Sequence, residues 1–343
     1  MPPAVTADQT IDAADPAVTV VIVNFNAGPH LTAVLTGLRN QSYPAFRAII
    51  VDNASSDGSI AAARPAVRDD ARFDFIESRS NIGFAAANNL AANGTDTPWL
   101  ALLNPDAVPT TDWLEQLMAA TDRHPDAVMF GSTQLNMANP EILDGAGDRY
   151  FAAGIPWRGG YGWPRTALPP EGEVFSPCAA AALYRTDIFR AASGFEESFF
   201  CYIEDVDLAF RLRLRGHRCI QVPAAIVHHA GSATSGGANS AFARYHGTRN
   251  MIWCFVRNMP APLFYPLLPF HIGTLLVLWL RACWSGMNQP VGRGIIDAVR
   301  GLAVALAQRS RIQTARKAST AQIAGWLTWN PAIYLRRSPA SLR

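Results

Sequence analysis

The 343-residue sequence predicts an α/β fold with a mostly parallel central sheet, followed by C-terminal helices that associate with a membrane. Three observations lead to this prediction. From Val18 onward, apolar runs of strand length alternate with amphipathic stretches, which is the pattern of βαβ units. Each of the first four apolar runs ends in a polar cluster. The last part of the chain combines a long apolar run with an excess of basic residues.

The predicted strands and helices of the first part follow one another over residues 18–123. The apolar residues of each helical stretch recur three or four positions apart, whereas the strands are short continuous apolar runs. The strands are Val18–Val23, Ala48–Asp52, Phe73–Glu77 and Trp99–Leu103, and the helices are His30–Arg39, Ser59–Val67, Phe84–Ala92 and Asp112–Arg123. Ligands of open parallel sheets bind at the carboxyl ends of the strands, so the polar clusters there are expected to form one site.

The middle of the chain departs from this rhythm. Residues 137–177 are rich in Gly, Pro and aromatic residues and are expected to be a long irregular insertion, of the kind that is usually functional or mobile. An ordered part follows, with a helix at Asp205–Arg215, strands at Cys219–Val222 and Ala225–His229, and a helix at Phe242–Val256. The arginines at 211, 213 and 215 are expected to form a solvated face of the first of these helices.

The C-terminal region has the pattern of a monotopic membrane anchor. Leu263–Leu280 is just long enough to span a membrane, although Pro266, Pro269 and Gly273 argue against a straight span. Val291–Ala307 is amphipathic, and residues 281–343 hold ten of the 29 basic residues but only one of the 27 acidic residues. An apolar face with basic flanks suits an anionic lipid surface. The alternative is a helical pair that packs on the main domain or forms a dimer.

The N-terminal residues and the cysteines of the chain indicate a cellular compartment for the protein. Residues 1–16 hold no apolar run and are expected to be a disordered lead-in without a secretory signal. The five cysteines are widely spaced and include no CxxC pair. We therefore expect a reduced, cytoplasmic protein without a structural zinc site.

Six motifs, taken in order, resemble glycosyltransferase family 2, especially its rhamnosyltransferase-like branch. They are VTVVIVNFNAGPHL, AIIVDNASSDGS, SRSNIGFAAANN, ALLNPDAVPTTDWL, GFEESFFCYIEDVDLAFRLRLRGH and VHHAGSAT, and they extend over about residues 18–255. The resemblance implies a GT-A fold, with a Rossmann-like nucleotide-binding domain over residues 17–257. Its donor half would cover about residues 17–130 and its acceptor half about 131–257, and residues 258–343 would form the C-terminal helices.

The resemblance also implies a donor site at the strand ends. Asp52 could accept a hydrogen bond from a pyrimidine N–H, and Gly83 allows close backbone approach to a diphosphate. The alternative is that Asp52 and Asp57 only cap the following helix. The donor-binding residues implied in this way are Asn24, Asn26, Asp52, Asn53, Asn81, Gly83, Asn88, Asn104 and Asp106.

Asn104-Pro105-Asp106 occupies the place of the family's DxD metal signature, with Asn104 in place of its first Asp. By resemblance, Asp106 would hold Mg²⁺ or Mn²⁺ against the donor diphosphate. The alternative is an ordinary Asn-Pro-Asp turn. The family also places a metal-binding histidine after a late strand. Spacing to Thr234 favours His228 over His229, and strand alternation allows only one of the two to face the site.

Glu204 and Asp205 precede an amphipathic helix, where negative charge is stabilised. Inverting transfer needs one carboxylate to take the proton of the attacking hydroxyl. By resemblance, Asp205 is the base and Glu204 its orienting neighbour, while Asp207 supports the helix dipole. The alternative is that all three residues only cap the helix.

The acceptor side is expected to include Glu196 and the aromatic residues Trp157 and Tyr161, because aromatic faces pack against sugar rings. Cys178-Ala179-Ala180 stands where the family usually shows Gly-Ala, and this departure leaves the shape of the acceptor site open.

The resulting hypothesis is an inverting, metal-dependent glycosyltransferase that extends a lipid-linked saccharide in cell-envelope or exopolysaccharide synthesis, at the cytoplasmic face of the inner membrane. By resemblance alone, dTDP-L-rhamnose is the leading donor. The alternatives are a UDP- or GDP-sugar used on a soluble acceptor, and a non-catalytic scaffold of the same fold.

Two other classes fit the sequence less well. A dinucleotide-dependent oxidoreductase would need a GxGxxG turn after the first strand, where the chain reads Asn24-Phe25-Asn26-Ala27-Gly28. Nucleic acid is not expected as a partner of the basic tail, because the adjacent apolar run favours lipid. The sequence leaves the oligomeric state open.

Overall fold

The computed structural model describes residues 15–231 and 239–338. A ten-stranded sheet runs through the described chain in the order β10-β12-β6-β11-β4-β1-β2-β3, and β5 and β7 pair with β12 and β6. Most of the predicted lead-in (1–16) falls on residues 1–14, which lie outside the described residues. Ser232–Thr234, at the end of the last motif, also lie outside them.

The first four strands form the parallel part of the sheet, as predicted. They are β1 (Val18–Asn24), β2 (Phe46–Asp52), β3 (Phe73–Glu77) and β4 (Trp99–Leu103), and they alternate with α1 (Pro29–Arg39), α2 (Ser59–Ala63), α3 (Gly83–Asn93) and α4 (Trp113–Arg123). Asn24 pairs with Asp52, and Asp52 pairs with Glu77. The strand ends therefore lie side by side, as the positions of the polar clusters require.

The other strands make the sheet mixed. β11 (Ala181–Arg185) runs antiparallel between β4 and β6 (Ala127–Asn136), and β12 (Arg218–His229) runs parallel to β6. The short strand β5 (Ala107–Pro109) pairs with the end of β12. β12 replaces the two strands predicted here, with an irregular register between Val222 and Ile226 around Pro223. α5 (Thr186–Ala191) follows β11, and α6 (Glu204–Leu214) precedes β12.

The insertion at 137–177 is more regular than expected. It contains β7 (Leu143–Ala146), a hairpin of β8 (Asp148–Phe151) and β9 (Ile155–Arg158), and β10 (Gly172–Glu173). Gly154 lies between the two hairpin strands with a φ of +89°. Tyr150 and Trp157 are buried, so part of the aromatic content of this segment packs inside the protein.

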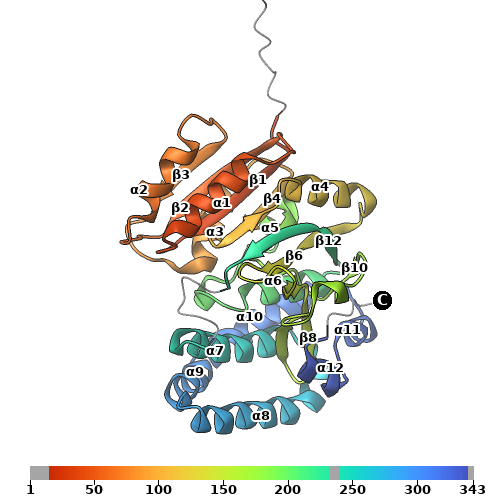
Figure 1. The fold of residues 1–343 in the computed structure, drawn as a ribbon. Helices are drawn as coiled ribbons and strands as arrows, with labels where there is room; N and C mark the ends of the chain where they lie inside the picture. Colours follow the sequence, from red (N-terminus) through yellow and green to blue (C-terminus); the bar gives the residue numbers. More distant parts are fainter. Residues whose placement is uncertain (1–14, 232–238, 339–343) are drawn as a thin grey trace, which may run out of the picture.

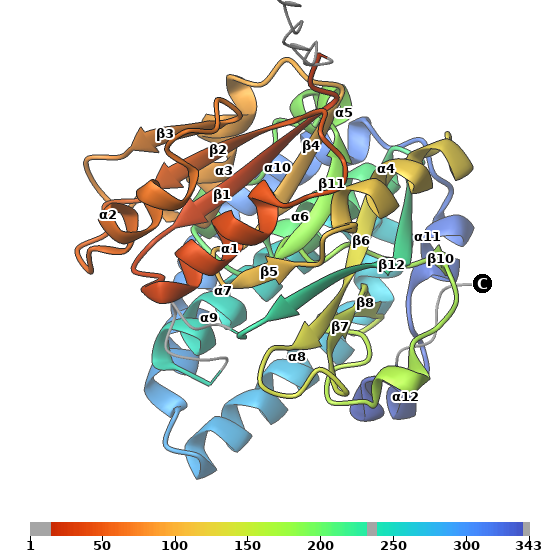
Figure 2. The ribbon, with the colours of Figure 1, turned by 45° about the horizontal axis from the view of Figure 1, so that its top comes forward.

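Helices make up most of the C-terminal region. They are α7 (Ala241–Asn258), α8 (Ala261–Trp284), α9 (Asn288–Arg300), α10 (Leu302–Thr314), α11 (Thr320–Trp326) and α12 (Pro331–Arg336). α8 lies along the outer edge of the molecule, at the end opposite β1, β2 and β3 (Figure 1, Figure 2), and remains one helix despite Pro266 and Pro269. By length and composition α8 could cross a membrane. Only 11% of its apolar 18-residue stretch is buried. The predicted stretch Val291–Ala307 is divided between α9 and α10 at Gly301.

One hydrophobic cluster joins the C-terminal helices to the rest of the protein. It contains Val206 and Phe210 of α6, Phe255 of α7 and Ile323 of α11. Near this cluster the backbone N–H groups of Lys317 and Ala318 both donate to the carbonyl of Leu214. The C-terminal region therefore packs directly on the helix that begins with Glu204 and Asp205.

The prediction of a solvated arginine face on α6 is wrong for two of its three members. Arg213 is fully buried and donates to the carbonyl of Phe175, at 2.7 Å. Arg211 is 7% exposed and donates to Asp207, at 2.8 Å. Asp207 is itself fully buried and also accepts from Asn258 at 2.8 Å, so it does more than support the helix dipole. The reason is that residues outside α6 cover this face.

Candidate active site

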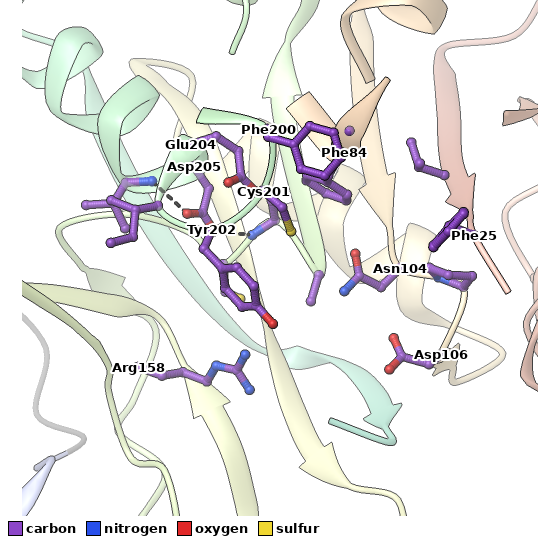
Figure 3. A pocket seen from close by; sticks show the side chains of 18 of the residues that line it. Phe25, Phe84, Asn104, Asp106, Arg158, Phe200, Cys201, Tyr202, Glu204 and Asp205 are labelled. Carbon is purple, nitrogen blue, oxygen red and sulfur yellow. Dashed lines mark hydrogen bonds between the residues drawn. The ribbon is translucent and has the colours of Figure 1, made fainter. Parts of the chain in front are cut away.

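A cavity of about 580 Å³ lies at the carboxyl ends of the parallel strands. Figure 3 shows Glu204 and Asp205 on one side of it and Asn104 and Asp106 on the other. Eight of the predicted site residues line it, namely Asn53, Asn81, Gly83, Asn104, Asp106, Trp157, Glu204 and Asp205. The structure therefore brings together residues from segments that are about 150 positions apart.

Side-chain amides hold the ends of β1 and β2 and the start of α3 together. Nδ2 of Asn24 donates to Oδ1 of Asp52 at 3.1 Å, and Nδ2 of Asn53 donates to Oδ1 of Asn81 at 2.9 Å. The same oxygen of Asn81 accepts from the N–H of Gly83 at 2.9 Å. Asn24 is fully buried beneath this layer. Asn53, Asn81 and Gly83 thus form the cavity wall, while Asn24 and Asp52 support it.

A carboxylate and an imidazole, from Asp106 and His229, also line the cavity. Oδ1 of Asp106 lies 3.3 Å from Nε2 of His229, and both residues are 2% exposed. Asp106 directly precedes β5, whose residue Ala107 pairs with His229 of β12, so the sheet itself fixes this approach. Asn104, which also lines the cavity, has a buried Oδ1 that finds no hydrogen-bond partner among the described residues.

The expectation that His228 faces the site is wrong, because His229 does. His228 is half-buried and burial lowers its pKa. Burial also opposes protonation of His229, but the neighbouring carboxylates of Asp106 and Asp144 outweigh it and raise the pKa of His229. The alternation rule was right that one histidine of the pair faces inward. The irregularity between Val222 and Ile226 determines which one it is.

Asp144 and Arg158 extend this arrangement into the insertion. Oδ2 of Asp144 lies 2.6 Å from Nδ1 of His229. Nη1 of Arg158 forms an ion pair with the same carboxylate oxygen and lies 3.3 Å from the carbonyl oxygen of Asp144. Burial raises the pKa of Asp144, but His229 and Arg158 hold it below the ordinary value.

Glu204 and Asp205 open α6 on the opposite side of the cavity. Oδ2 of Asp205 accepts from the N–H of Ala179 at 2.9 Å, and Oδ1 accepts from the N–H of Val206 at 2.8 Å. Burial raises the pKa of Asp205, although these N–H groups and Arg158 partly offset the effect. Burial and the charge of Asp205 raise the pKa of Glu204 well above its ordinary value.

A second group of possible metal ligands lies beside the base. Ligand atoms of Asp148, Cys178 and Asp205 all lie within 4.8 Å of one another. A positive charge already acts on this cluster, because Arg158 interacts electrostatically with all three groups. Burial raises the pKa of the Cys178 thiol to about 12 and that of Asp148 well above its ordinary value. The guanidinium of Arg158 therefore already supplies a counter-charge to the cluster.

The turn before Glu204 has an unusual backbone. Phe200, Tyr202 and Ile203 have φ values of +63°, +70° and +70°, which are costly for residues other than glycine. Nδ2 of Asn250, on α7, lies within 2.9 Å of the carbonyl oxygens of Phe199, Cys201 and Tyr202. A fully buried amide on another helix thus holds the strained turn that carries the two carboxylates.

Several predicted residues lie away from the cavity wall. Glu196 accepts from Arg257 and Gln308 at 3.0 Å each. Tyr161 is 44% exposed and lies under Arg337, and Nδ2 of Asn88 donates to the carbonyl of Phe84 within α3. Asn26 accepts from the N–H of Ser56 at 2.8 Å. These placements remove Glu196 and Tyr161 from the predicted acceptor side.

Sequence reasoning missed Asp144, Asp148 and Arg158, and it favoured His228 over His229. Asp148, Arg158 and His229 line the cavity, and Asp144 contacts His229. The three missed residues lie in the insertion that was expected to be irregular. The only available signal there was the DGAGDRY segment, in which two acidic residues flank two glycines. His229 was considered and set aside.

Comparisons with known proteins identify the family of the chain. Residues 19–191 match the family described as Glycosyl transferase family 2. The chain is 30% identical over 261 residues to the N-acetylglucosaminyl-diphospho-decaprenol L-rhamnosyltransferase of Mycobacterium tuberculosis, and the match covers 66% of this chain and 80% of the relative. It is 26% identical over 201 residues to the succinoglycan biosynthesis protein ExoA of Rhizobium meliloti, with 58% of each chain covered.

Solved structures share the fold. The mannosyltransferase PcManGT from Pyrobaculum calidifontis, in complex with GDP-Man and Mn²⁺, superposes with a TM-score of 0.54 at 16% identity, over 88% of this chain and 86% of the other. S. aureus TarS 1-349, in complex with UDP-GlcNAc, superposes with a TM-score of 0.55 at 17% identity, over 94% and 92% of the two chains.

The fold and the family match define the class of protein as a glycosyltransferase with a GT-A fold. The chain belongs to glycosyltransferase family 2.

Proposed function

We propose that this glycosyltransferase moves a sugar from a nucleotide-sugar donor to an acceptor hydroxyl with inversion, using Asp205 as the base and Asp106 with His229 as ligands of a divalent cation. One observation carries the proposal. A buried carboxylate–imidazole pair and a second carboxylate group lie on opposite sides of one cavity at the carboxyl ends of the strands.

The donor side fits a divalent cation by its chemistry. Neighbouring ligands of an octahedral Mg²⁺ or Mn²⁺ ion lie about 3 Å apart, because each metal–oxygen bond measures about 2.1 Å. The separation of 3.3 Å between Asp106 and His229 is close to this value, and Oδ1 of Asn104 could add a neutral oxygen. When bound, such an ion would neutralise the negative charge on the departing nucleoside diphosphate.

Asp205 has the environment that a base needs. As the acceptor oxygen attacks the anomeric carbon, the bond to the diphosphate breaks and the hydroxyl proton passes to the carboxylate of Asp205. The two N–H groups that bind Asp205 fix its orientation, and each carboxylate oxygen keeps a lone pair for the proton. Glu204, which precedes Asp205, lines the same side of the cavity, where we place the acceptor.

The walls between these two sides supply apolar surface for substrate. Phe25, Phe84, Trp157, Phe200, Tyr202 and Phe242 all line the cavity. We place the acceptor against Trp157 and Tyr202, on the side of Asp205. The relative is an L-rhamnosyltransferase whose name includes a decaprenol-linked saccharide, which supports L-rhamnose as the sugar and a lipid-linked saccharide as the acceptor. We take dTDP-L-rhamnose as the donor, in cell-envelope or exopolysaccharide synthesis. A UDP-sugar or GDP-sugar on a soluble acceptor is the competing assignment.

A lipid-linked acceptor agrees with the surface of α8. Only Leu267, His271 and Ala282 of this helix are buried. Its exposed large apolar residues are Tyr265, Phe270, Ile272, Leu276, Val277, Trp279, Leu280 and Trp284. Arg281 lies on α8, and Arg293 and Arg300 lie on α9. We propose that these helices hold the enzyme at the cytoplasmic face of the membrane, without assigning a span.

The decisive experiment measures thermal stabilisation by a panel of nucleoside diphosphates, with and without Mg²⁺ or Mn²⁺. Stabilisation by one nucleotide that requires the metal, and that disappears in Asp106→Ala, is the expected result and identifies the nucleotide of the donor. The matched control is Asp148→Asn, which changes a carboxylate on the other side of the cavity. If no nucleotide stabilises the wild-type protein, the non-catalytic scaffold becomes the better interpretation.

A further inference from the structure

We propose that Asp144 is a positioning residue for the metal site: it orients the His229 ring so that Nε2 faces Asp106, and Arg158 holds Asp144 in place. This inference rests on the proposed function, because it assigns His229 to the metal. It adds two residues of the insertion to the machinery of the reaction.

The sheet contains a local irregularity that directs Asp144 toward His229. β7 pairs with β6 through Gln134 with Gly145 and through Leu135 with Leu143. Asp144 is therefore the extra residue of a β-bulge, opposite no single partner. Bulges change the direction of a side chain and often occur next to active sites. Asp144 is only 5% exposed, and burying a carboxylate is costly unless it is paired and hydrogen-bonded.

The contacts determine which nitrogen of His229 is available. A neutral imidazole whose Nδ1–H donates a hydrogen bond to a carboxylate keeps a lone pair on Nε2. This hydrogen bond orients the ring of a metal-binding histidine. Oδ2 of Asp144 lies 2.6 Å from Nδ1, while Asp106 lies on the Nε2 side at 3.3 Å. The two carboxylates thus lie on opposite sides of the ring. Asp144 is placed to orient the histidine and not to bind the same ion.

Arg158 fixes Asp144 through two contacts from the neighbouring strand β9. It forms an ion pair with the Asp144 carboxylate and approaches the carbonyl oxygen of the same residue. A Cβ at Gly145 would lie 2.5 Å from Cδ of Arg158, so the arginine passes directly over the glycine that follows Asp144. The orientation of His229 therefore depends on a chain of three side chains, from β9 through β7 to β12.

The test is Mn²⁺ affinity, measured by the EPR signal of free Mn²⁺ in titrations of the full chain with a saturating nucleoside diphosphate. Asp144→Asn keeps the shape but loses the charge, and we expect its Mn²⁺ Kd to rise about 10- to 100-fold. Asp144→Glu, which restores a carboxylate, should recover part of this loss. The control is Asp70→Asn, which removes a carboxylate that is 12% exposed, is paired with Arg72 and lies outside the cavity; it should leave the Mn²⁺ Kd unchanged.

A kinetic split separates positioning from general damage. Rates of Asp144→Asn should approach the wild-type rate as Mn²⁺ is raised, so that the metal requirement changes more than kcat. Arg158→Gln tests the same orientation without altering the carboxylate, and should weaken Mn²⁺ binding less than Asp144→Asn. It also serves if Asp144→Asn does not fold, as judged by circular dichroism.

The outcomes distinguish this inference from the proposed function. Wild-type binding of Mn²⁺ with an unchanged Kd in Asp144→Asn overturns the role of Asp144 and leaves the metal site intact. Absence of Mn²⁺ binding by the wild-type protein, even with nucleotide, overturns the metal site itself and with it this role.

Discussion

Gly83 and Phe200 approach so closely that a Cβ on Gly83 would lie 2.5 Å from Cδ2 of the phenylalanine ring. The φ of Gly83 is +86°, and the N–H of Ala85 donates to the carbonyl of Phe200 at 3.1 Å. The first turn of α3 thus touches the strained turn before Glu204. The two sides of the cavity support each other at this contact, although they are more than 100 residues apart in the sequence.

Gly83→Ala should therefore destabilise the protein and impair transfer. The methyl group must displace Phe200, which costs about 1–3 kcal/mol for an overpacked site, in addition to backbone strain. Gly58→Ala is the matched control, because Gly58 also has a positive φ, +77°, but a Cβ there meets nothing within 4 Å. Urea unfolding and initial rates measure both variants. Equal losses in the two would show that strain alone, and not the contact with Phe200, is responsible.

Asp205→Asn should abolish sugar transfer and leave donor binding intact. Loss of a general base typically lowers the rate by about 10²–10⁴-fold, whereas the amide retains the size of the carboxylate. The measurements are initial transfer rates and the Kd of the nucleoside diphosphate in the presence of Mn²⁺. Full turnover by the variant would refute the assignment of the base.

The rate should also fall in acid, at a pH above the ordinary aspartate pKa of 3.8. Burial raises the pKa of Asp205, and only its deprotonated form accepts a proton, so activity is present above that pKa and lost below it. Arg158→Gln should move the acidic limb of the kcat/KM–pH profile, which reports the free enzyme, to higher pH, because the charge of Arg158 lowers this pKa. A profile that does not move would exclude this electrostatic influence.

Asp207→Asn should cost far more stability than the loss of a surface ion pair. The carboxylate is fully buried between Arg211, Arg257 and Asn258, and breaking a buried pair typically costs about 3–5 kcal/mol. Glu77→Gln, which removes the exposed pair with Arg64, should cost less than about 1 kcal/mol. Urea unfolding at pH 7 tests the difference.

The pH dependence of stability follows from the same carboxylate. Although burial raises the pKa of Asp207, Arg257 and Arg211 hold it below the ordinary value. The stabilisation is therefore complete above the pKa of the unfolded state and is lost as pH falls through the folded-state pKa. The loss of stability between pH 7 and pH 3 should be smaller in Asp207→Asn than in wild-type protein. An identical loss in the two proteins would contradict this origin.

Leu276→Glu combined with Leu280→Glu should release the protein from vesicles that contain anionic lipid. Each buried leucine contributes about 1.5–3 kcal/mol on transfer from water, so the double variant should bind at least about tenfold more weakly. Leu90→Glu is the control, because Leu90 of α3 is 45% exposed and Leu280 is 47% exposed. Cosedimentation with vesicles measures the effect. Equal binding by the double variant and wild-type protein would remove α8 from the contact.

The parallel half of the sheet was predictable because its signals are local. Apolar runs such as Val18–Val23 and Trp99–Leu103 have the length and composition of buried strands, and their polar ends converge by the geometry of parallel sheets. Asp106, Glu204 and Asp205 could be assigned because family motifs mark them. The structure places all three on the wall of one cavity.

The remaining site residues depend on contacts between distant segments. His229 faces inward because β12 is irregular between Val222 and Ile226, and no pattern in the histidine pair itself reveals this. Asp144 reaches the site through a bulge in a strand of four residues, too short to show a period. Arg213 is covered by Phe175, which lies 38 positions away, and the sequence of α6 alone does not show such a contact.

The hydrophobic cluster shared by α6 and α11 connects the C-terminal helices to the candidate active site. Phe210 and Ile323 belong to it, and the helix of Phe210 begins with the two carboxylates of the cavity. A chain cut after Asn258 would remove Ile323 and Leu327 from this cluster and so uncover part of it. If the C-terminal helices bind a bilayer, the same cluster would transmit the resulting force to α6. Membrane binding and the orientation of Asp205 would then be coupled.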